Sequence, residues 1–325
     1  MSKNNNFAVI DIGTNNVKCI CFTNGTTIDI EQDYTLKNKI LTQKSGENIN
    51  PNELLQYIKD YIEVAKKYKI NSDKVYIVAT EAFRKSSNKQ EITNLIKEQN
   101  GRRIHVISPK REAYLSALGG LSYIRNNFKS KPNKILYIES GGGSTEVSLL
   151  DTSRRSFLSM LQTISIPLGS KDKVNNHDLE KHNVYFSKLS TQIKDTDNIA
   201  VVVNSAAAGR ILAHHIKLKK YIPAYVAKKQ LGTSTNIFLA KLDNILSMKD
   251  EDIQNNFYLG RGDPQGFISH CKILSYILKK SPKALKAPLT TTIGGLKLGV
   301  EKEIEKACGN EEKISQILEN DRYER

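Results

Sequence analysis

Residues 135–150 have the sequence ILYIESGGGSTEVSLL, which is the strongest indication of the fold. An apolar run over 135–138 ends in an acid, Glu139, and a second apolar run begins at Val147. Consecutive glycines and hydroxyl side chains lie between the two runs. Glycine lets the backbone turn sharply and leaves amide groups uncovered for an anion. The pattern therefore predicts a strand, a phosphate-binding turn and a return strand.

The same design occurs near the N-terminus, in residues 7–22, FAVIDIGTNNVKCICF. An apolar run reaches Asp11, a glycine turn follows at 13–16, and a return strand starts at Val17. One such turn alone is most often a hairpin, but two of matching design favour a shared function. Because a carboxylate repels a phosphate, we expect Asp11 and Glu139 to hold Mg²⁺, or another divalent cation, that bridges to it.

Outward from these stretches, strand patterns alternate with helical ones. Strand patterns occupy residues 74–80, 103–107, 156–167, 199–203 and 290–293. Helical patterns occupy residues 51–69, 88–98, 108–123 and 178–193, several segments up to 281, and a charged terminal segment. This alternation predicts an α/β fold with largely parallel sheets.

The chain has 325 residues, which is too long for one ordinary domain and favours two domains with a cleft between them. Residues 125–134 are polar and basic and contain a proline, so they are the expected crossing. We predict an N-terminal domain over 1–125 and a C-terminal domain over 126–299. A terminal helix over 300–325 is expected to pack back on the N-terminal domain.

The composition narrows the class of protein. Lys and Arg number 49 against 34 Asp and Glu, and the net charge of +15 attracts anions, unless it only reflects biased residue usage. No helix pairs a basic face with aromatic residues, which argues against a nucleic-acid partner. The N-terminus is polar, which argues against a signal peptide. The chain has no long apolar run, which argues against a membrane span. The four cysteines form no zinc or disulfide pattern, which favours the cytoplasm.

Six motifs occur in order along the chain. They are VIDIGTN at 9–15, ATEAFR at 79–84, REAY at 111–114, ESGGGSTE at 139–146, IPLG at 166–169 and GGLKLG at 294–299. In this order the sequence resembles the exopolyphosphatase and guanosine pentaphosphate phosphohydrolase family, in its short two-domain form. That family is a branch of the superfamily that includes actin, hexokinase and heat-shock chaperone ATPases.

The resemblance implies two ribonuclease H-like (actin-like ATPase) domains that face each other across a cleft. It implies hydrolysis of terminal phosphoanhydride bonds in inorganic polyphosphate, with guanosine pentaphosphate or tetraphosphate as further ligands, and it is compatible with a homodimer. Glu112 would activate the attacking water, Arg84 would grip phosphate, and Glu146 would lie near the metal. Without the resemblance, Glu112 would be interpreted as a solvated helix residue and Arg84 as an ordinary surface residue.

The resemblance also assigns phosphate-binding and metal-binding residues in both loops. The phosphate-binding residues are Gly13, Thr14, Asn15, Asn16, Gly141, Gly142, Gly143, Ser144 and Thr145. The metal-binding residues are Asp11 and Glu139.

The sequence departs from the family pattern at several positions. Glu139 stands where Asp is usual, Asn16 replaces a Ser, and Lys18 replaces an Arg. Residues 204–209 read NSAAAG where a Gly-Gly-Thr signature is expected. The first and last departures favour an alternative hypothesis, in which the chain is a weak or inactive relative that binds polyphosphate or a guanine alarmone as a regulatory module.

Overall fold

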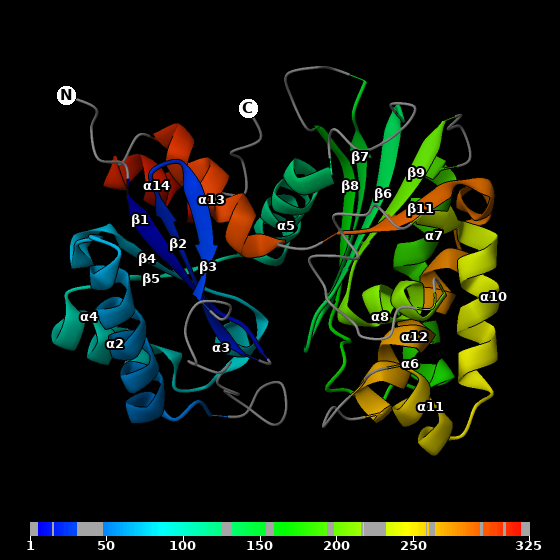
Figure 1. Cartoon of the computed structure of the whole chain (residues 1–325), viewed down its shortest axis with the longest axis horizontal. Coiled ribbons are helices and arrows are strands. Elements are labelled where there is room, and N and C mark those ends of the chain that lie inside the picture. Colours follow the sequence, from blue (N-terminus) through cyan, green and yellow to red (C-terminus); the bar gives the residue numbers. More distant parts are fainter. Residues whose placement is uncertain are drawn as a thin grey trace. The chain divides into compact units, whose positions relative to one another are not determined.

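The structure of the chain is a computed structural model. It describes residues 6–14, 16–30, 48–124, 132–153, 159–193, 198–215, 217, 232–257, 259, 264–292, 295–307 and 310–319. The chain divides into two compact units (Figure 1). The first unit comprises Met1–Gly119 and Leu296–Arg325, and the second comprises Gly120–Gly295.

The first unit is built on a sheet with the strand order β3-β2-β1-β4-β5. Its strands are β1 (Phe7–Ile12), β2 (Val17–Thr23), β3 (Thr26–Asp29), β4 (Val75–Ala79) and β5 (Ile104–Val106). The helices of this unit are α2 (Pro51–Lys67), α3 (Glu81–Lys85), α4 (Lys89–Asn100), most of α5 (Pro109–Ile124), α13 (Leu296–Ala307) and α14 (Glu311–Glu319), with the 3-10 helix η1 (Ser72–Lys74).

Both faces of this sheet are buried because side chains of a strand point alternately to its two sides. Ala8, Ile10 and Ile12 pack with α2 and α4 on one side. Phe7 and Val9 pack with residues of α13 and α14 on the other side. Figure 1 shows these two helices beside β1. Asp11 follows Phe7 and Val9 in this alternation, so its side chain belongs to the face that α13 covers.

The second unit repeats the strand order of the first. Its strands are β6 (Lys134–Ser140), β7 (Thr145–Asp151), β8 (Ser159–Ile166), β9 (Ile199–Asn204), β10 (Gly232–Ser234) and β11 (Pro288–Thr291). The sheet order is β10-β11-β9-β6-β7-β8, and read from β8 to β11 it matches β3-β2-β1-β4-β5. The repetition predicted from the two loops is therefore confirmed at the level of topology.

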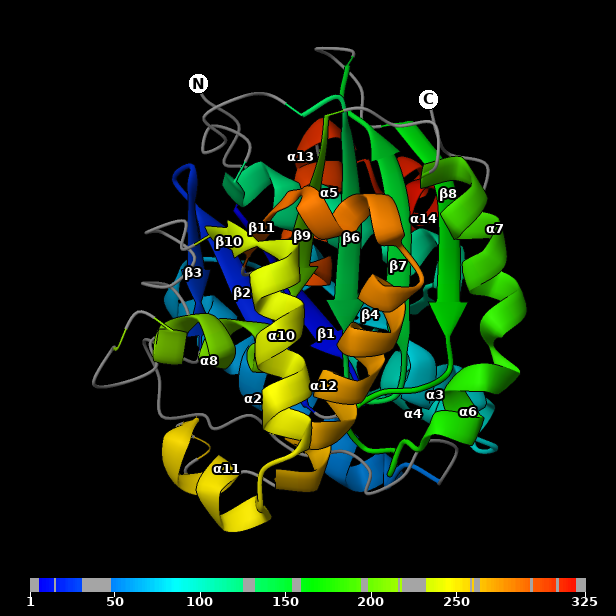
Figure 2. The same cartoon turned by 90° about the vertical axis from the view of Figure 1, so that its right-hand side faces the viewer.

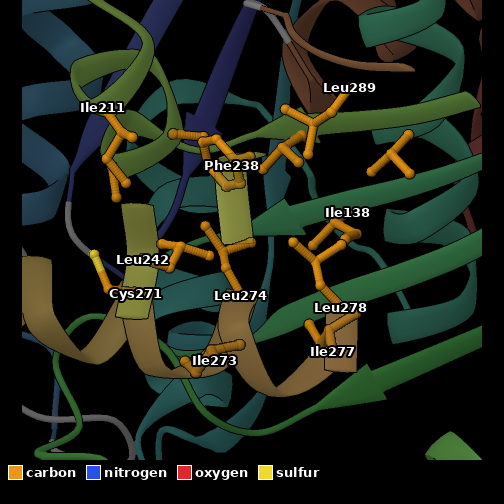
Figure 3. Packing of buried hydrophobic residues seen from close by; sticks show 14 of the residues in the cluster. Ile138, Ile211, Phe238, Leu242, Cys271, Ile273, Leu274, Ile277, Leu278 and Leu289 are labelled. Atoms are coloured by element: carbon orange, nitrogen blue, oxygen red, sulfur yellow. The ribbon is translucent and has the colours of Figure 1, made fainter. Parts of the chain in front are cut away.

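One face of the second sheet carries the core of this unit. Its helices are α6 (Asn176–Lys181), α7 (Asn183–Ile193), α8 (Ala206–His215), α10 (Thr235–Leu246), α11 (Asp250–Asn256) and α12 (Pro264–Lys279), with the 3-10 helix η2 (Pro282–Lys286). Figure 2 shows α10 and α12 against the sheet, and Figure 3 shows Phe238, Leu242, Leu274 and Leu278 packed with Ile138. Residues of opposite parity on β6, including Tyr137 and Glu139, belong to the other face.

The prediction of largely parallel sheets is wrong. Strand β1 runs parallel to β4 but antiparallel to β2, and β6 runs parallel to β9 but antiparallel to β7. The turns that join β1 to β2 and β6 to β7 are too short for the crossover connection that a parallel pair needs. Both sheets are consequently mixed.

The chain passes between the units at Gly119–Gly120 and at Gly295–Leu296, compared with the expected positions after 125 and after 299. The first crossing lies inside α5, because this helix continues from Pro109 to Ile124. The terminal segment forms α13 and α14 in place of one helix, and the Asn310 side chain accepts a hydrogen bond from the Lys313 amide as α14 begins. Within the described ranges, every helix is too short or too polar to cross a membrane.

Candidate active site

The first loop is a tight turn closed by a backbone hydrogen bond. The Gly13 amide donates to the Asn16 carbonyl with an N···O distance of 3.0 Å. A Cβ atom at position 13 would lie 3.3 Å from that carbonyl, so glycine suits the turn. Thr14 is buried, and its amide donates to no acceptor among the described residues. Asn15 lies outside the described residues.

Asp11 ends β1 with an unpaired carboxylate oxygen. Its Oδ1 atom is buried and has no hydrogen-bond partner in the described part of the chain. Burial raises the pKa of Asp11, although Lys18 and Lys297 act to lower it. Lys297 also pairs with Asp29, with an Nζ···Oδ2 distance of 3.2 Å. A buried carboxylate oxygen without a donor is suited to a hard cation, which fits the role expected of Asp11.

The first unit also holds a carboxylate–guanidinium cluster. Arg84 lies in α3, directly after β4, and its Nη1 atom donates to Glu112 Oε2 at 2.7 Å. Its Nη2 atom donates to Glu81 Oε2 at 2.9 Å, and Nη1 also bonds the Ile107 carbonyl. Burial acts to lower the pKa of Arg84, but Glu112 and Glu81 outweigh it, so the pKa lies above its ordinary value. Arg84 is therefore charged and fixed.

This cluster brings together two predicted catalytic residues and one that was not predicted. The side chains of Arg84 and Glu112 are only 15% and 12% exposed, so neither is an ordinary surface residue. Glu81, whose side chain is 9% exposed, was missed as a site residue. Its spacing of three residues from Arg84 in ATEAFR was the available signal, because residues three apart on a helix lie on one side.

The second loop has the same closure as the first. The Gly141 amide donates to the Ser144 carbonyl at 2.9 Å, as Gly13 does to Asn16. The amides of Gly142, Gly143 and Ser144 donate to no acceptor within the described ranges. Three successive amides without acceptors form the kind of backbone site that binds a phosphate.

The carbonyl groups of this loop accept hydrogen bonds from residues outside the loop. The carbonyls of Gly141 and Gly142 accept hydrogen bonds from the amides of Ser170 and Lys171 at 3.0 and 2.9 Å. The buried ring of His270, in α12, lies with Nε2 2.9 Å from the Gly141 carbonyl. Burial lowers the pKa of His270, so the ring is neutral and its Nε2 proton is the one donated. The loop carbonyls therefore accept hydrogen bonds from the protein, while the loop amides remain available to bind an anion.

Gly169 packs directly against the backbone of the second loop, and this close approach gives a testable prediction. A Cβ atom there would lie 2.5 Å from both the carbonyl carbon and the oxygen of Gly142. We expect Gly169→Ala to displace the loop, lower phosphate-releasing activity and reduce the free energy of unfolding by about 1–3 kcal/mol. Lys173→Ala, an exposed change in the same turn, is the control for both measurements. Equal activity and stability of the two variants would contradict the packing argument.

Two carboxylates flank the second loop. Glu139 and Glu146 are directly opposite each other in the β6–β7 pair, at the positions that Asp11 and Lys18 occupy in the β1–β2 pair. Glu146 Oε1 accepts a hydrogen bond from Ser165 at 3.0 Å, and Glu139 Oε2 accepts one from Tyr137 at 3.2 Å. Like charges at opposite positions repel unless donors or a cation lie nearby.

The described residues contain no group of three or more His, Cys, Asp or Glu side chains placed to hold a metal. Mg²⁺ does not need such a group, because it keeps several waters and binds one or two carboxylates together with substrate phosphates. The paired carboxylates beside the second loop and the unpaired Asp11 oxygen fit this manner of binding.

The predicted residues thus gather separately in the two units. Asp11 lies at the first loop, Arg84 contacts Glu112, and Glu139 and Glu146 flank the second loop. The Thr145 side chain is fully buried and donates to the Leu168 carbonyl, so it shapes the loop from within. That both loops serve one substrate, and that a cleft separates the units, stay predictions.

Comparisons with known proteins place this geometry in a family context. Residues 20–177 match the model of the Ppx/GppA phosphatase family. The chain is also similar to the bifunctional 3-dehydroquinate synthase/phosphatase of Fusobacterium nucleatum subsp. nucleatum, with 32% identity over 45% of this chain. The match spans 23% of the length of that relative.

Solved structures agree with the fold over nearly the whole chain. A Ppx/GppA family member from Aquifex aeolicus has a TM-score of 0.69 at 20% identity, covering 94% of this chain and 98% of its own. An exopolyphosphatase from Cytophaga hutchinsonii has a TM-score of 0.68 at 17% identity, covering 93% and 98%. The ribonuclease H-like fold expected of each unit is therefore confirmed.

Proposed function

Because residues 20–177 match the model of the Ppx/GppA phosphatase family, we propose that this chain is a member that hydrolyses terminal phosphoanhydride bonds of inorganic polyphosphate with the aid of Mg²⁺. The observation that carries the proposal is the partly buried ion pair of Arg84 and Glu112, with an Nη1···Oε2 distance of 2.7 Å. A fixed guanidinium supplies charge for a phosphoryl group, and a carboxylate beside it supplies a base for water. Guanosine pentaphosphate is a second substrate of the same chemical class.

Arg84 keeps donors for a substrate. A guanidinium has five N–H groups, and here Nη1 bonds Ile107 and Glu112 while Nη2 bonds Glu81. The Nε–H group and one Nη2–H group have no acceptor among the described residues. These donors are able to grip phosphate oxygens without breaking the contacts that fix Arg84.

In the proposed reaction, Glu112 orients a water molecule. Its Oε2 atom is engaged by Arg84, and this contact holds the carboxylate in one orientation. A water that donates a hydrogen bond to this carboxylate would be aligned for in-line attack on the terminal phosphorus. As the new P–O bond forms, Glu112 accepts a proton of the water, and the bridging P–O bond breaks. The shortened polyphosphate leaves with the bridging oxygen, and the attacked phosphoryl group with the water oxygen becomes orthophosphate.

The two glycine loops would hold the phosphates that do not react. Their uncovered amides donate to phosphate oxygens, and Asp11, Glu139 and Glu146 are the side chains that would hold a divalent cation. When bound, Mg²⁺ would neutralise the negative charge of the phosphates. Since phosphoryl transfer depends mainly on position and charge, fixed donors of this kind supply most of the rate enhancement.

The experiment that tests the proposal is release of orthophosphate by the wild-type protein. Polyphosphate and guanosine pentaphosphate are supplied side by side, with Mg²⁺ and with excess chelator. We expect release of orthophosphate that requires the cation. No release from either substrate in the presence of Mg²⁺ would contradict the proposed activity.

A second candidate function is binding without turnover. It is favoured by the presence of Glu139 and Asn204 beside the second loop, where the family pattern has other residues. Calorimetric titration with polyphosphate decides between the two functions when it is combined with the release assay. Tight binding without release of orthophosphate would select the regulatory module.

A further inference from the structure

Three polar side chains, those of Tyr137, Glu139 and Asn204, lie together near the second loop, on the sheet face opposite to the core. Tyr137 and Glu139 are two residues apart on β6, so they point to the same side. Asn204, at the end of β9, is the register partner of Glu139. Tyr137 is 1% exposed, whereas Asn204 and Glu139 are partly exposed. The cluster therefore extends from the interior of the unit to the edge of the loop.

The hydrogen bonds of this cluster have a defined direction. The Tyr137 hydroxyl lies 3.2 Å from Glu139 Oε2 and donates to it. The Asn204 side chain is also a hydrogen-bond partner of the Tyr137 hydroxyl. Because the single Tyr137 proton is donated to Glu139, the Asn204 amide group is the donor to the phenol oxygen.

Two glycines make room for the cluster. A Cβ atom at Gly120 would lie 2.5 Å from the Tyr137 hydroxyl oxygen. A Cβ atom at Gly295 would lie 2.5 Å from Asn204 Nδ2 and 2.8 Å from Glu139 Oε1. Gly295 also has a φ angle of +68°, which disfavours any side chain. The Glu139 carboxylate is therefore enclosed on one side by backbone and on another by a hydroxyl donor.

This enclosure limits the positions that the longer glutamate side chain at position 139 can occupy. Glutamate has one more rotatable bond than the aspartate that the family pattern has, so an unsupported carboxylate would occupy more positions. Glu146 also stands opposite and repels it. We propose that Tyr137 and Asn204 are positioning residues that fix the Glu139 carboxylate for a divalent cation. This rests on the proposed function, in which Glu139 holds Mg²⁺.

The test is binding of Mn²⁺, as a probe of the cation site, to the full chain without substrate, followed by calorimetry. We expect Tyr137→Phe to weaken Mn²⁺ binding about 10- to 100-fold, the usual effect of removing a residue that orients a metal-binding side chain. Tyr76→Phe is the matched control, because the Tyr76 hydroxyl is also buried but has no partner among the described residues. It should bind Mn²⁺ as the wild type does.

The same substitution in a chain that also carries Glu139→Gln distinguishes a positioning role of Tyr137 from a general structural role. If Tyr137 acts through Glu139, then Tyr137→Phe has no further effect on Mn²⁺ binding in a Glu139→Gln chain. A purely structural loss would persist in both backgrounds and would overturn the inference. So would wild-type affinity in Tyr137→Phe, or a wild type that binds no Mn²⁺. Failure of the proposed function is distinguishable, since it shows as absent orthophosphate release whatever the calorimetry gives.

Discussion

Glu112→Gln is expected to slow the release of orthophosphate from polyphosphate by about 10²- to 10⁴-fold, the usual contribution of a general base. Glutamine keeps the shape of the side chain and an acceptor for Arg84, but it does not take the proton of the attacking water. The effect should fall on kcat, with little change in KM, because the substrate phosphates are held elsewhere. Initial rates over a range of polyphosphate concentrations measure both constants.

The matched control for this substitution is Glu98→Gln. Glu98 lies on α4, is exposed, and makes no described contact, so its replacement should leave kcat unchanged. Thermal unfolding of both variants shows whether the loss of the ion pair with Arg84 alters the fold. A Glu112→Gln protein that is folded and hydrolyses polyphosphate at the wild-type rate would remove Glu112 from the mechanism.

Arg84→Lys is expected to lower kcat/KM for polyphosphate about 10²- to 10³-fold, comparable with losing a donor that stabilises the transition state. Lysine keeps the positive charge, yet its single ammonium group does not span Glu81 and Glu112 as the two Nη atoms do. It also lacks the fork that grips two phosphate oxygens. The substitution therefore separates geometry from charge.

Arg103→Lys is the control, because Arg103 is exposed and pairs with Glu319 at 2.6 Å on the surface. Exposed pairs of this kind contribute about 0–1 kcal/mol, so neither kcat/KM nor stability should change appreciably. If Arg84→Lys and Arg103→Lys gave the same activity, the charge of Arg84 would be sufficient, and its fork would have no role.

Local sequence signals were enough to predict the elements that carry the loops. Asn50 and Pro51 predicted the start of a helix, and Asn50 Oδ1 does accept hydrogen bonds from the amides of Asn52 and Glu53. The strand, glycine turn and return strand occur at both predicted places. These features depend on residues that are neighbours in the chain, which is why a sequence pattern records them.

One strand was missed although its signal was present. Asn24-Gly25 is a turn pair typical of two-residue hairpins, and both residues have positive φ angles, 52° and 74°. The turn joins β2 to β3, and β3 forms the sheet edge of the first unit. The alternation of strands and helices along the rest of the chain predicts parallel pairing, and it gives no indication of this antiparallel hairpin.

The supports of the candidate site could not be found from local patterns. In the sequence, Tyr137 is one apolar residue of a strand pattern. Its proposed role depends on the contact with Asn204 and on the absence of a side chain at Gly120. His270 reads as a helix residue, and only the fold brings it to the Gly141 carbonyl. Contacts between residues that are far apart in the chain leave no periodic signal in one sequence.

We propose that the two carboxylate-tipped loops, one in each unit, act on one substrate. A double-mutant cycle of Asp11→Asn and Glu139→Gln tests it, with kcat/KM for polyphosphate as the measured quantity. Residues that act as one unit are strongly non-additive, so the double variant should be no slower than the slower single variant. Losses that multiply in the double variant would contradict the claim, because they would mean that the loops act independently.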